Sequence, residues 1–125
     1  MLFRSRTELA RRAVFVCPIL SGSGVRVKLL EAFAAGIPVV STTIGAEGLA
    51  RSDGEFCSLA DDPREFARKT LAILECPRQA LAMTKRARAE VEASWDMTVL
   101  TEKLETSYRE VLREKRRITC RSDPA

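Results

Sequence analysis

Two short apolar runs, separated by a glycine turn and a helical segment, constrain the fold of this chain more than any other feature. The first run spans Ala13 to Cys17 and is closed by Pro18, and the second spans Ile37 to Ser41. Such runs, bounded by breakers, are typical of strands buried on both faces of a parallel sheet. Between them lie the turn Ser21-Gly22-Ser23-Gly24 and apolar residues that recur at helical spacing from Val25 to Ala35. The order strand, turn, helix, strand predicts a βαβ unit and an α/β fold.

The rest of the chain is mostly helical in pattern. We expect Gly36 to cap the first helix and Asp62 to cap a helix that begins at Pro63. The further expected elements are a helix at Arg4–Arg12, a short edge strand at Phe56–Leu59, a helix from Pro77 to about Glu92, a break at Trp95-Asp96 and a last amphipathic helix from Asp96 to about Arg116. The two or three parallel strands expected here, followed by a helical C-terminal half, are too few for a complete doubly wound domain. We therefore expect residues 1–125 to form a single partial Rossmann-like domain, with a core at about 13–60 and a helical tail at about 62–117.

The residue types exclude several kinds of chemistry. The chain has 125 residues, four cysteines without paired spacing and no histidine, so we expect no zinc site and no other metal site. Without an imidazole, Cys-His and Ser-His catalysis are also excluded. No apolar run approaches the roughly 18 residues of a membrane span, and residues 1–12 do not resemble a secretory signal. We expect a cytoplasmic protein with reduced thiols.

The basic excess is concentrated near the end of the chain, although the net charge is only +4. Six cations face only Glu110 and Glu114 there: Arg109, Arg113, Lys115, Arg116, Arg117 and Arg121. One interpretation is a solvated helix end, where cations oppose the negative end of the helix dipole. Another is peripheral contact with an anionic membrane, at the inner face in a cytoplasmic protein. We expect no nucleic-acid partner, because Tyr108 is the only aromatic residue nearby.

The glycine turn is a candidate anion site. A turn that leads from a buried strand into a helix places backbone N–H groups at the positive end of the helix dipole, where phosphate binds readily. Arg26 and Lys28 are expected in the first helical turn, where the dipole disfavours cations and a bound diphosphate would explain them. Glu31, two turns in, has the chemistry to accept hydrogen bonds from a ribose diol. The alternatives are an ordinary strand-to-helix turn, solvated cations, and an ion pair between Glu31 and Lys28.

Residues Cys17 to Leu49 closely resemble the nucleotide-sugar signature of family 4 glycosyltransferases, which have the GT-B fold. The matching form is P-x3-G-x-G-x-R-x-K-x-x-E-A-x-A-x-G-x-P-V-V-S-T followed by G-A-E-G-L. The stretch from Asp53 to Pro63 and the tail with Trp95-Asp96 are similar to the same family. The resemblance implies that the chain is the C-terminal, donor-binding part of a retaining glycosyltransferase, of the kind used in polysaccharide biosynthesis.

The site residues that the resemblance implies follow the signature. Glu31 matches the glutamate that binds the ribose hydroxyls. The loop that approaches the diphosphate or donor sugar is matched by Gly22, Ser23 and Gly24, followed by Val25. Arg26 and Lys28 match basic positions near this loop, and the segment 42–48 matches a loop at the edge of the site. The implied ligand is a nucleoside-diphosphate sugar, bound as substrate, with no cofactor and no metal.

Two departures from the family limit what the chain is expected to do. Many members carry a second glutamate eight positions before the first, and Ser23 stands there. The acceptor site and most catalytic contacts belong to an N-terminal domain that this sequence lacks, so we assign no catalytic residue and expect no transfer by the isolated chain. The alternative is a noncatalytic interaction or oligomerisation module derived from this fold, which self-associates or binds a separate N-terminal half.

Overall fold

A computed structural model describes residues 13–121, with side chains up to residue 118. The chain divides into two compact units, Met1–Glu92 and Ala93–Ala125, and each is described by itself. The expected single partial domain spans both units. The helix expected at Arg4–Arg12 lies outside the described residues.

Unit 1 contains one parallel sheet of three short strands. They are β1 (Phe15–Cys17), β2 (Val39–Ser41) and β3 (Ser58–Leu59), in the order β1-β2-β3. Phe15 lies opposite Val39 and Val40 lies opposite Ser58. The two strands predicted from apolar runs and the predicted edge strand are all present and parallel, which confirms the α/β class and the partial Rossmann-like architecture.

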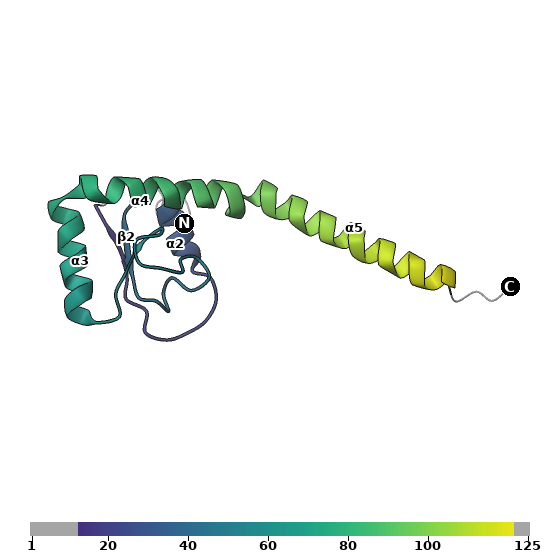
Figure 1. The fold of residues 1–125 in the computed structure, drawn as a ribbon, viewed down its shortest axis with the longest axis horizontal. Helices are drawn as coiled ribbons and strands as arrows, with labels where there is room; N and C mark the ends of the chain where they lie inside the picture. Colours follow the sequence, from purple (N-terminus) through teal and green to yellow (C-terminus); the bar gives the residue numbers. More distant parts are fainter. Residues whose placement is uncertain (1–12, 122–125) are drawn as a thin grey trace, which may run out of the picture. The chain divides into compact units, whose positions relative to one another are not determined.

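Helix α2 (Val27–Ala34) connects β1 to β2 and buries Leu29, Ala32 and Phe33. Gly36 ends it as predicted, with φ +69°, and its N–H donates to the Phe33 carbonyl over 3.0 Å. A residue with a side chain is rarely found in this left-handed conformation. In Figure 1, α2 lies on one side of the strands and α3 on the other.

Helices α3 (Pro63–Glu75) and α4 (Pro77–Glu90) complete unit 1. Asp62 caps α3 as predicted, because its carboxylate accepts from the N–H groups of Arg64 and Glu65 at 2.9 and 3.0 Å. Val40, Ile73, Ala80 and Met83 form a buried hydrophobic cluster, with Val14 and Phe66 packed against it. This cluster therefore joins the central strand to both helices.

The last helix follows a π-helical turn, η1 (Val91–Trp95), that the sequence pattern did not predict. Asp96 then starts α5 (Met97–Arg121), since its carboxylate accepts from the N–H of Thr98 over 2.8 Å. The predicted break at Trp95-Asp96 is therefore present, and α5 extends five residues beyond the expected end near Arg116. No helix among the described residues is long and apolar enough to cross a membrane.

Candidate functional site

The loops that follow the three strands meet at the carboxyl edge of the sheet. The Thr42 N–H donates to the Cys17 carbonyl over 3.2 Å, and the Thr42 hydroxyl donates to the carbonyl of Ile19. Thr43 donates through its N–H and its hydroxyl to the two carboxylate oxygens of Asp61, at 2.8 and 2.7 Å. These contacts fasten the segments after β1, β2 and β3 to one another. Ligands of open α/β sheets bind at this edge.

Gly45 is essential to the close approach of these segments. Its N–H donates to the Thr42 hydroxyl over 2.9 Å. A Cβ at this position would lie closer than 3.0 Å to the Ser41 hydroxyl oxygen and at 3.0 Å from the Cys17 carbonyl oxygen. Because real Cβ atoms essentially never come within 3.0 Å of such atoms, only glycine fits here. Gly45 lies within the segment 42–48 that was expected at the edge of the site, but its own role was not predicted.

The predicted glycine loop is exposed and has the backbone conformation that its glycines suggested. Gly22 has φ +113° and Gly24 has φ +90°, and both glycines and Ser23 are exposed. Nothing lies within 4 Å of the position that a Gly24 Cβ would occupy. A Cβ on Gly48, which has φ +77°, would lie 3.1 Å from the Val25 side chain. The glycine loop therefore lies beside the loop that follows β2.

Arg26 turns back over the glycine loop. Its Nη1 donates to the Ser23 carbonyl over 3.1 Å, and its Nη2 lies 3.0 Å from where a Gly22 Cβ would stand. Its Nε and Nη2 atoms are buried and have no hydrogen-bond partner within the described part of the chain. A buried donor without a partner costs about 1–3 kcal/mol. An anion at the glycine loop would supply the acceptor that these N–H groups lack.

The structure corrects the expected position of Arg26 within the helix. Helix α2 begins at Val27, so Arg26 is the N-cap residue, with φ −88° and ψ 102°, rather than a member of the first turn. The extended backbone at the N-cap lets its side chain fold toward the loop. Lys28 lies in the first turn as predicted, and that turn contains no acidic residue.

A cavity of about 390 Å³ lies beside the glycine loop. It is lined by two short segments, 15–19 from β1 and the turn after it, and 25–29 from the start of α2. Its volume falls in the range of small-molecule sites, and such sites are mostly apolar with a few polar groups. Val25, Arg26 and Lys28 are thus brought together at one cavity.

Glu31 lies farther along α2 and is half-buried. It does not line the cavity. No salt bridge joins it to Lys28 among the described residues, so the ion pair considered as its alternative role is absent. The structure therefore brings Arg26 and Lys28 to the glycine loop and leaves Glu31 on the body of the helix.

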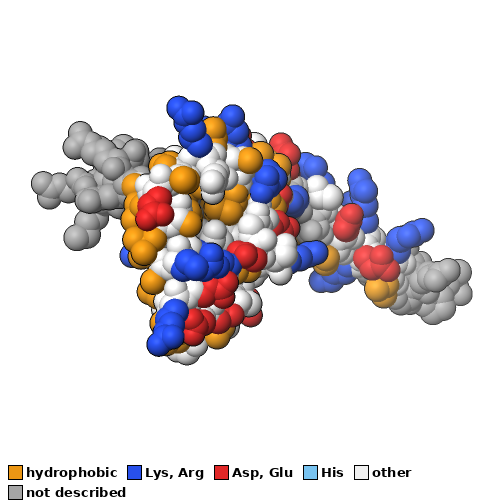
Figure 2. Space-filling model, turned by 60° about the vertical axis from the view of Figure 1, so that its left-hand side comes forward, with side chains coloured by type: hydrophobic (Ala, Val, Ile, Leu, Met, Phe, Trp, Pro, Cys, Tyr) orange, Lys and Arg blue, Asp and Glu red, His pale blue; other side chains and the backbone are white. Residues whose placement is uncertain are grey.

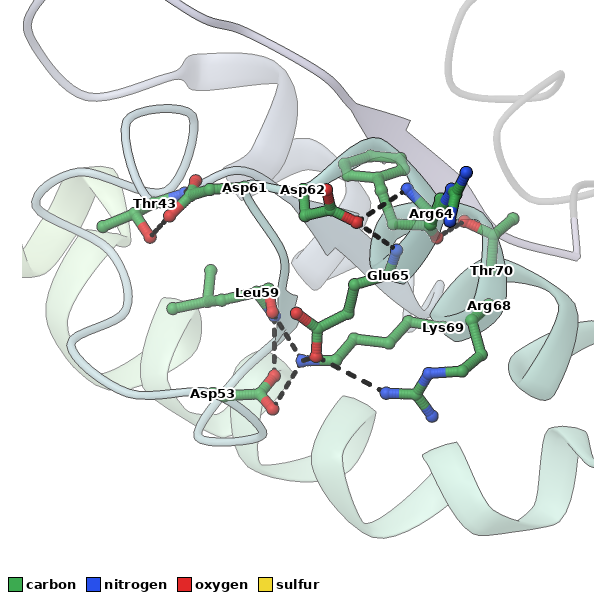
Figure 3. A network of polar contacts seen from close by, with 11 residues as sticks. Thr43, Asp53, Leu59, Asp61, Asp62, Arg64, Glu65, Arg68, Lys69 and Thr70 are labelled. Atoms are coloured by element: carbon green, nitrogen blue, oxygen red, sulfur yellow. Dashed lines mark hydrogen bonds and ion pairs between the residues drawn. The ribbon is translucent and has the colours of Figure 1, made fainter.

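A polar network that was not predicted from the sequence supports the loop between β2 and β3 (Figure 3). The Lys69 ammonium, which is 15% exposed, donates to the Asp53 carboxylate over 2.6 Å and to the Leu59 carbonyl over 2.5 Å. The Leu59 N–H donates to the same carboxylate over 2.7 Å. Arg86 holds this loop from α4 by donating to the carbonyls of Gly54 and Glu55. In the sequence, the Asp53-Gly54 turn was the feature that pointed to this network. Spacing along the chain could not identify Lys69, sixteen residues away, as the partner of Asp53.

The electrostatics of this edge follow from these hydrogen bonds. Burial opposes ionisation of Asp53, but the hydrogen bonds from Lys69 and the Leu59 N–H outweigh it and lower its pKa. The hydroxyl and N–H of Thr43 lower the pKa of Asp61. Burial, with the nearby Asp53 charge, raises the pKa of the Cys57 thiol to about 12, so this sulfur is not a nucleophile at neutral pH.

The described cysteines and carboxylates form no metal site. Cys17, Cys57 and Cys76 are free thiols in the structure. No group of three or more His, Cys, Asp or Glu residues in the described part could hold a metal ion. A second cavity, of about 210 Å³, is lined by residues of β3, α3 and α4 and by none of the predicted site residues.

Comparison with known proteins identifies relatives of this chain. The family described as "Glycosyl transferases group 1" matches residues 4–76. A protein of Escherichia coli (strain K12) named "Putative colanic acid biosynthesis glycosyltransferase WcaL" is 34% identical over 99 residues, which cover 73% of this chain and 24% of the relative. An "Uncharacterized 44.6 kDa protein in cps region" of Klebsiella pneumoniae is 42% identical over 55 residues, 44% of this chain and 14% of the relative. The matched part of the chain spans less than a quarter of the length of each relative.

Proposed function

The chain belongs to the group 1 glycosyltransferases, and from this premise we propose that unit 1 carries the donor side of a retaining active site, where a nucleoside-diphosphate sugar binds. The observation that carries the proposal is the Arg26 guanidinium. It lies against the glycine loop, and two of its buried nitrogen atoms have no hydrogen-bond partner among residues 13–118. A diphosphate supplies the oxygen acceptors that would pair with them, in charge-assisted hydrogen bonds.

Under this proposal the diphosphate lies against residues 22–24 and the start of α2. Gly24 leaves the backbone open to close approach, and the first-turn N–H groups of α2 supply the positive end of a helix dipole. Arg26 and Lys28 add positive charge at the same place. When the bond between sugar and diphosphate breaks, negative charge grows on the leaving group. Fixed donors aimed at that charge lower the barrier.

Glu31 and Ser23 have the remaining roles at this site. The Glu31 carboxylate, which is half-buried and lies one turn beyond Lys28, would accept hydrogen bonds from the ribose hydroxyls. Ser23 would face the donor sugar where many family members have a carboxylate. A hydroxyl is neutral, so its hydrogen bonds with the sugar are weaker than the charge-assisted bonds that a carboxylate would make.

We propose that transfer takes place only in a longer assembly. The matched part of this chain covers less than a quarter of its relatives, and transfer needs an oriented acceptor as well as a donor. The names of the two relatives refer to colanic acid biosynthesis and to a cps region, which supports a role in polysaccharide biosynthesis. The free thiols at Cys17, Cys57 and Cys76 support a reducing, cytoplasmic location.

Calorimetric titration of the purified chain with UDP, GDP and ADP tests the proposal. We expect one nucleotide to bind with a Kd of about 0.1–1 mM, because half of the site is present. Arg26→Gln should weaken binding about tenfold or more, since hydrogen bonds to charged groups contribute about 1.5–3 kcal/mol. Glu31→Ala should weaken binding of the nucleotide but not of pyrophosphate, which has no ribose.

Matched controls remove the same charges elsewhere in unit 1. Arg64→Gln and Glu75→Ala change exposed residues at the two ends of α3 and should leave binding unchanged. If the folded chain binds none of the three nucleotides, or if Arg26→Gln binds as tightly as the original chain, the proposed donor site is wrong.

The edge of the sheet favours the second candidate, a noncatalytic interaction module. Among the described residues, β1 is paired only with β2. Val16 within β1 is 46% exposed, and Leu20, three residues after the strand, is 76% exposed. An open strand edge accepts a strand from another chain. Under this alternative the chain associates with itself or with a separate N-terminal half. Sedimentation would then show a dimer that Val16→Lys disrupts, and the nucleotide titrations would show no binding.

A further inference from the structure

The glycine loop has few contacts that would fix its position. Residues 20–25 are exposed, and within the described part of the chain none of them takes part in a backbone–backbone hydrogen bond. Of the hydrogen bonds among residues 13–118, one side-chain bond reaches this segment, from Arg26 to the Ser23 carbonyl over 3.1 Å. The position of the loop therefore depends on how the chain is held where it enters and leaves the loop.

Thr42, the first residue after β2, holds the entry to the loop. Its hydroxyl donates to the Ile19 carbonyl and accepts from the Gly45 N–H over 2.9 Å. Its own N–H donates to the Cys17 carbonyl over 3.2 Å, and its carbonyl accepts from the Ala46 N–H over 3.0 Å. Thr42 is only 4% exposed, and each of its polar groups makes a hydrogen bond. It is therefore a buried, fully bonded point from which the turn after β1 is held.

The exit from the loop lies against the same segment of the chain. A Cβ on Gly48 would stand 3.1 Å from the Val25 side chain. Leu29, one turn farther on, is fully buried and anchors the start of α2. Packing thus holds the exit, whereas the hydroxyl of Thr42 is the polar link to the entry.

An ordinary turn would need only part of what the Thr42 hydroxyl does. A Ser or Thr hydroxyl in a turn bonds to the backbone a few residues away, as Thr42 does with the Gly45 N–H. The bond to Ile19 instead spans twenty-three residues and joins two loops. It uses the hydroxyl proton, which the contact with Gly45 leaves available. This second bond indicates a role in placing the glycine loop as well as in shaping the turn.

The position of the loop matters because general attraction for an anion is weak. The net charge is only +4, and on the face drawn in Figure 2 basic and acidic side chains lie interspersed. A diphosphate would depend on individual donors, which are the N–H groups of the loop and the guanidinium of Arg26. Hydrogen bonds weaken steeply as their distances and angles depart from the preferred values, so a displaced loop would bind less well.

We propose that Thr42 is a positioning residue of the donor site, whose hydroxyl fixes the glycine loop where its N–H groups and Arg26 can bind one diphosphate. Thr42 acts through Ile19 and the loop rather than by touching the ligand. The effect on affinity rests on the proposed donor site, whereas the anchoring of the loop does not.

Backbone ¹⁵N relaxation of the full chain without ligand tests the anchoring. Thr42→Val keeps the shape of the side chain but removes the hydroxyl, and Thr42→Ser keeps the hydroxyl. In Thr42→Val we expect the order parameters of residues 20–24 to fall from about 0.85, typical of ordered backbone, to below about 0.6. Thr42→Ala, a smaller side chain that also lacks the hydroxyl, should give the same fall, and Thr42→Ser should give none.

Calorimetric titration with pyrophosphate and with UDP, GDP and ADP tests the effect on binding. Thr42→Val should weaken pyrophosphate and the nucleotide that binds by the same factor, about tenfold or about 1.4 kcal/mol, because the loop contacts the diphosphate group that both share. Thr42→Ser should bind as the original chain does. Thr84→Val is the matched control, since Thr84 is 5% exposed and its hydroxyl donates within α4 to the Leu81 carbonyl over 2.9 Å. It should lower Tm without changing affinity measured well below Tm.

Two results for Thr42→Val would overturn the proposal, namely unchanged order parameters at residues 20–24 or unchanged affinity for pyrophosphate. Equal weakening in Thr84→Val would overturn it as well, because the loss would then come from general destabilisation. If the original chain binds neither pyrophosphate nor a nucleotide, the proposed donor site is wrong. The order parameters then decide alone whether Thr42 fixes the loop.

Discussion

Replacement of Gly45 by alanine is the sharpest test of how the edge of the sheet is assembled. Gly45 does not have a positive φ, so alanine can adopt its backbone conformation. The only new feature is a methyl group within 3.0 Å of the Ser41 hydroxyl oxygen and at 3.0 Å from the Cys17 carbonyl oxygen. Both neighbours are buried and belong to strands. The methyl group therefore meets a rigid environment on two sides.

The expected cost follows from two contributions. Overpacking of a well-packed site costs about 1–3 kcal/mol. If the Ser41 side chain moves away, its 2.9 Å hydrogen bond to the Thr42 carbonyl is lost, which adds about 1 kcal/mol. We expect Gly45→Ala to lower the free energy of unfolding by roughly 2–4 kcal/mol. For a unit of this size, that corresponds to a fall in Tm of at least about 10 °C.

Thermal and urea unfolding, followed by circular dichroism, measure this change. Gly36→Ala is the contrasting variant, because Gly36 has φ +69° and open space around its Cβ position, so its cost is a backbone cost of about 1 kcal/mol. In a double-mutant cycle, Ser41→Ala should reduce the cost of Gly45→Ala by at least about 1 kcal/mol, since it removes the nearest atom. A Gly45→Ala protein as stable as the original chain would refute this account of the edge.

Three further predictions concern unit 1. Asp62→Ala should lower its stability by about 1 kcal/mol by removing the α3 cap, whereas Asp62→Ser, which keeps an acceptor, should change little in the same unfolding assay. Because the folded state lowers the pKa values of Asp53 and Asp61, their contribution is present at neutral pH and is lost as the pH falls below about 4. In acid titration, the double variant with Asn at both positions should show a flatter decline. At pH 8 a thiol reagent should modify exposed Cys76 rapidly and Cys57 only after unfolding, and peptide mapping that finds early label on Cys57 would contradict its burial.

The sequence was informative wherever a structure depends on neighbouring residues. The apolar runs that became β1 and β2, the cap at Asp62 and the stop at Gly36 are local features, and all four were predicted correctly. The strands are shorter than the runs, because hydrogen-bonded pairing ends before the apolar character does. The break at Trp95-Asp96 was predicted, but the π-helical turn η1 before it was missed, because Val91–Trp95 contains no glycine or proline.

The contacts that organise the site could not be predicted, because they join residues that are distant in the chain. The Thr43–Asp61 hydrogen bonds span eighteen residues, and the fit of Gly45 against Ser41 and Cys17 depends on strand register. Arg26 was predicted as a site residue from its place beside the glycine turn. The Arg26 side chain turns back over the loop because of the N-cap conformation of its backbone, and no sequence pattern specified that conformation.

Residue-resolved NMR titration with a nucleoside diphosphate would test the central claim, the donor site at the glycine loop, most directly. The ¹⁵N-labelled chain would be titrated with UDP, GDP and ADP. For the nucleotide that binds, we predict the largest shifts at the backbone N–H groups of residues 22–28 and at the Arg26 Nε–H, with smaller shifts around Glu31. Absence of shifts, or shifts centred on the cavity between α3 and α4, would contradict the account.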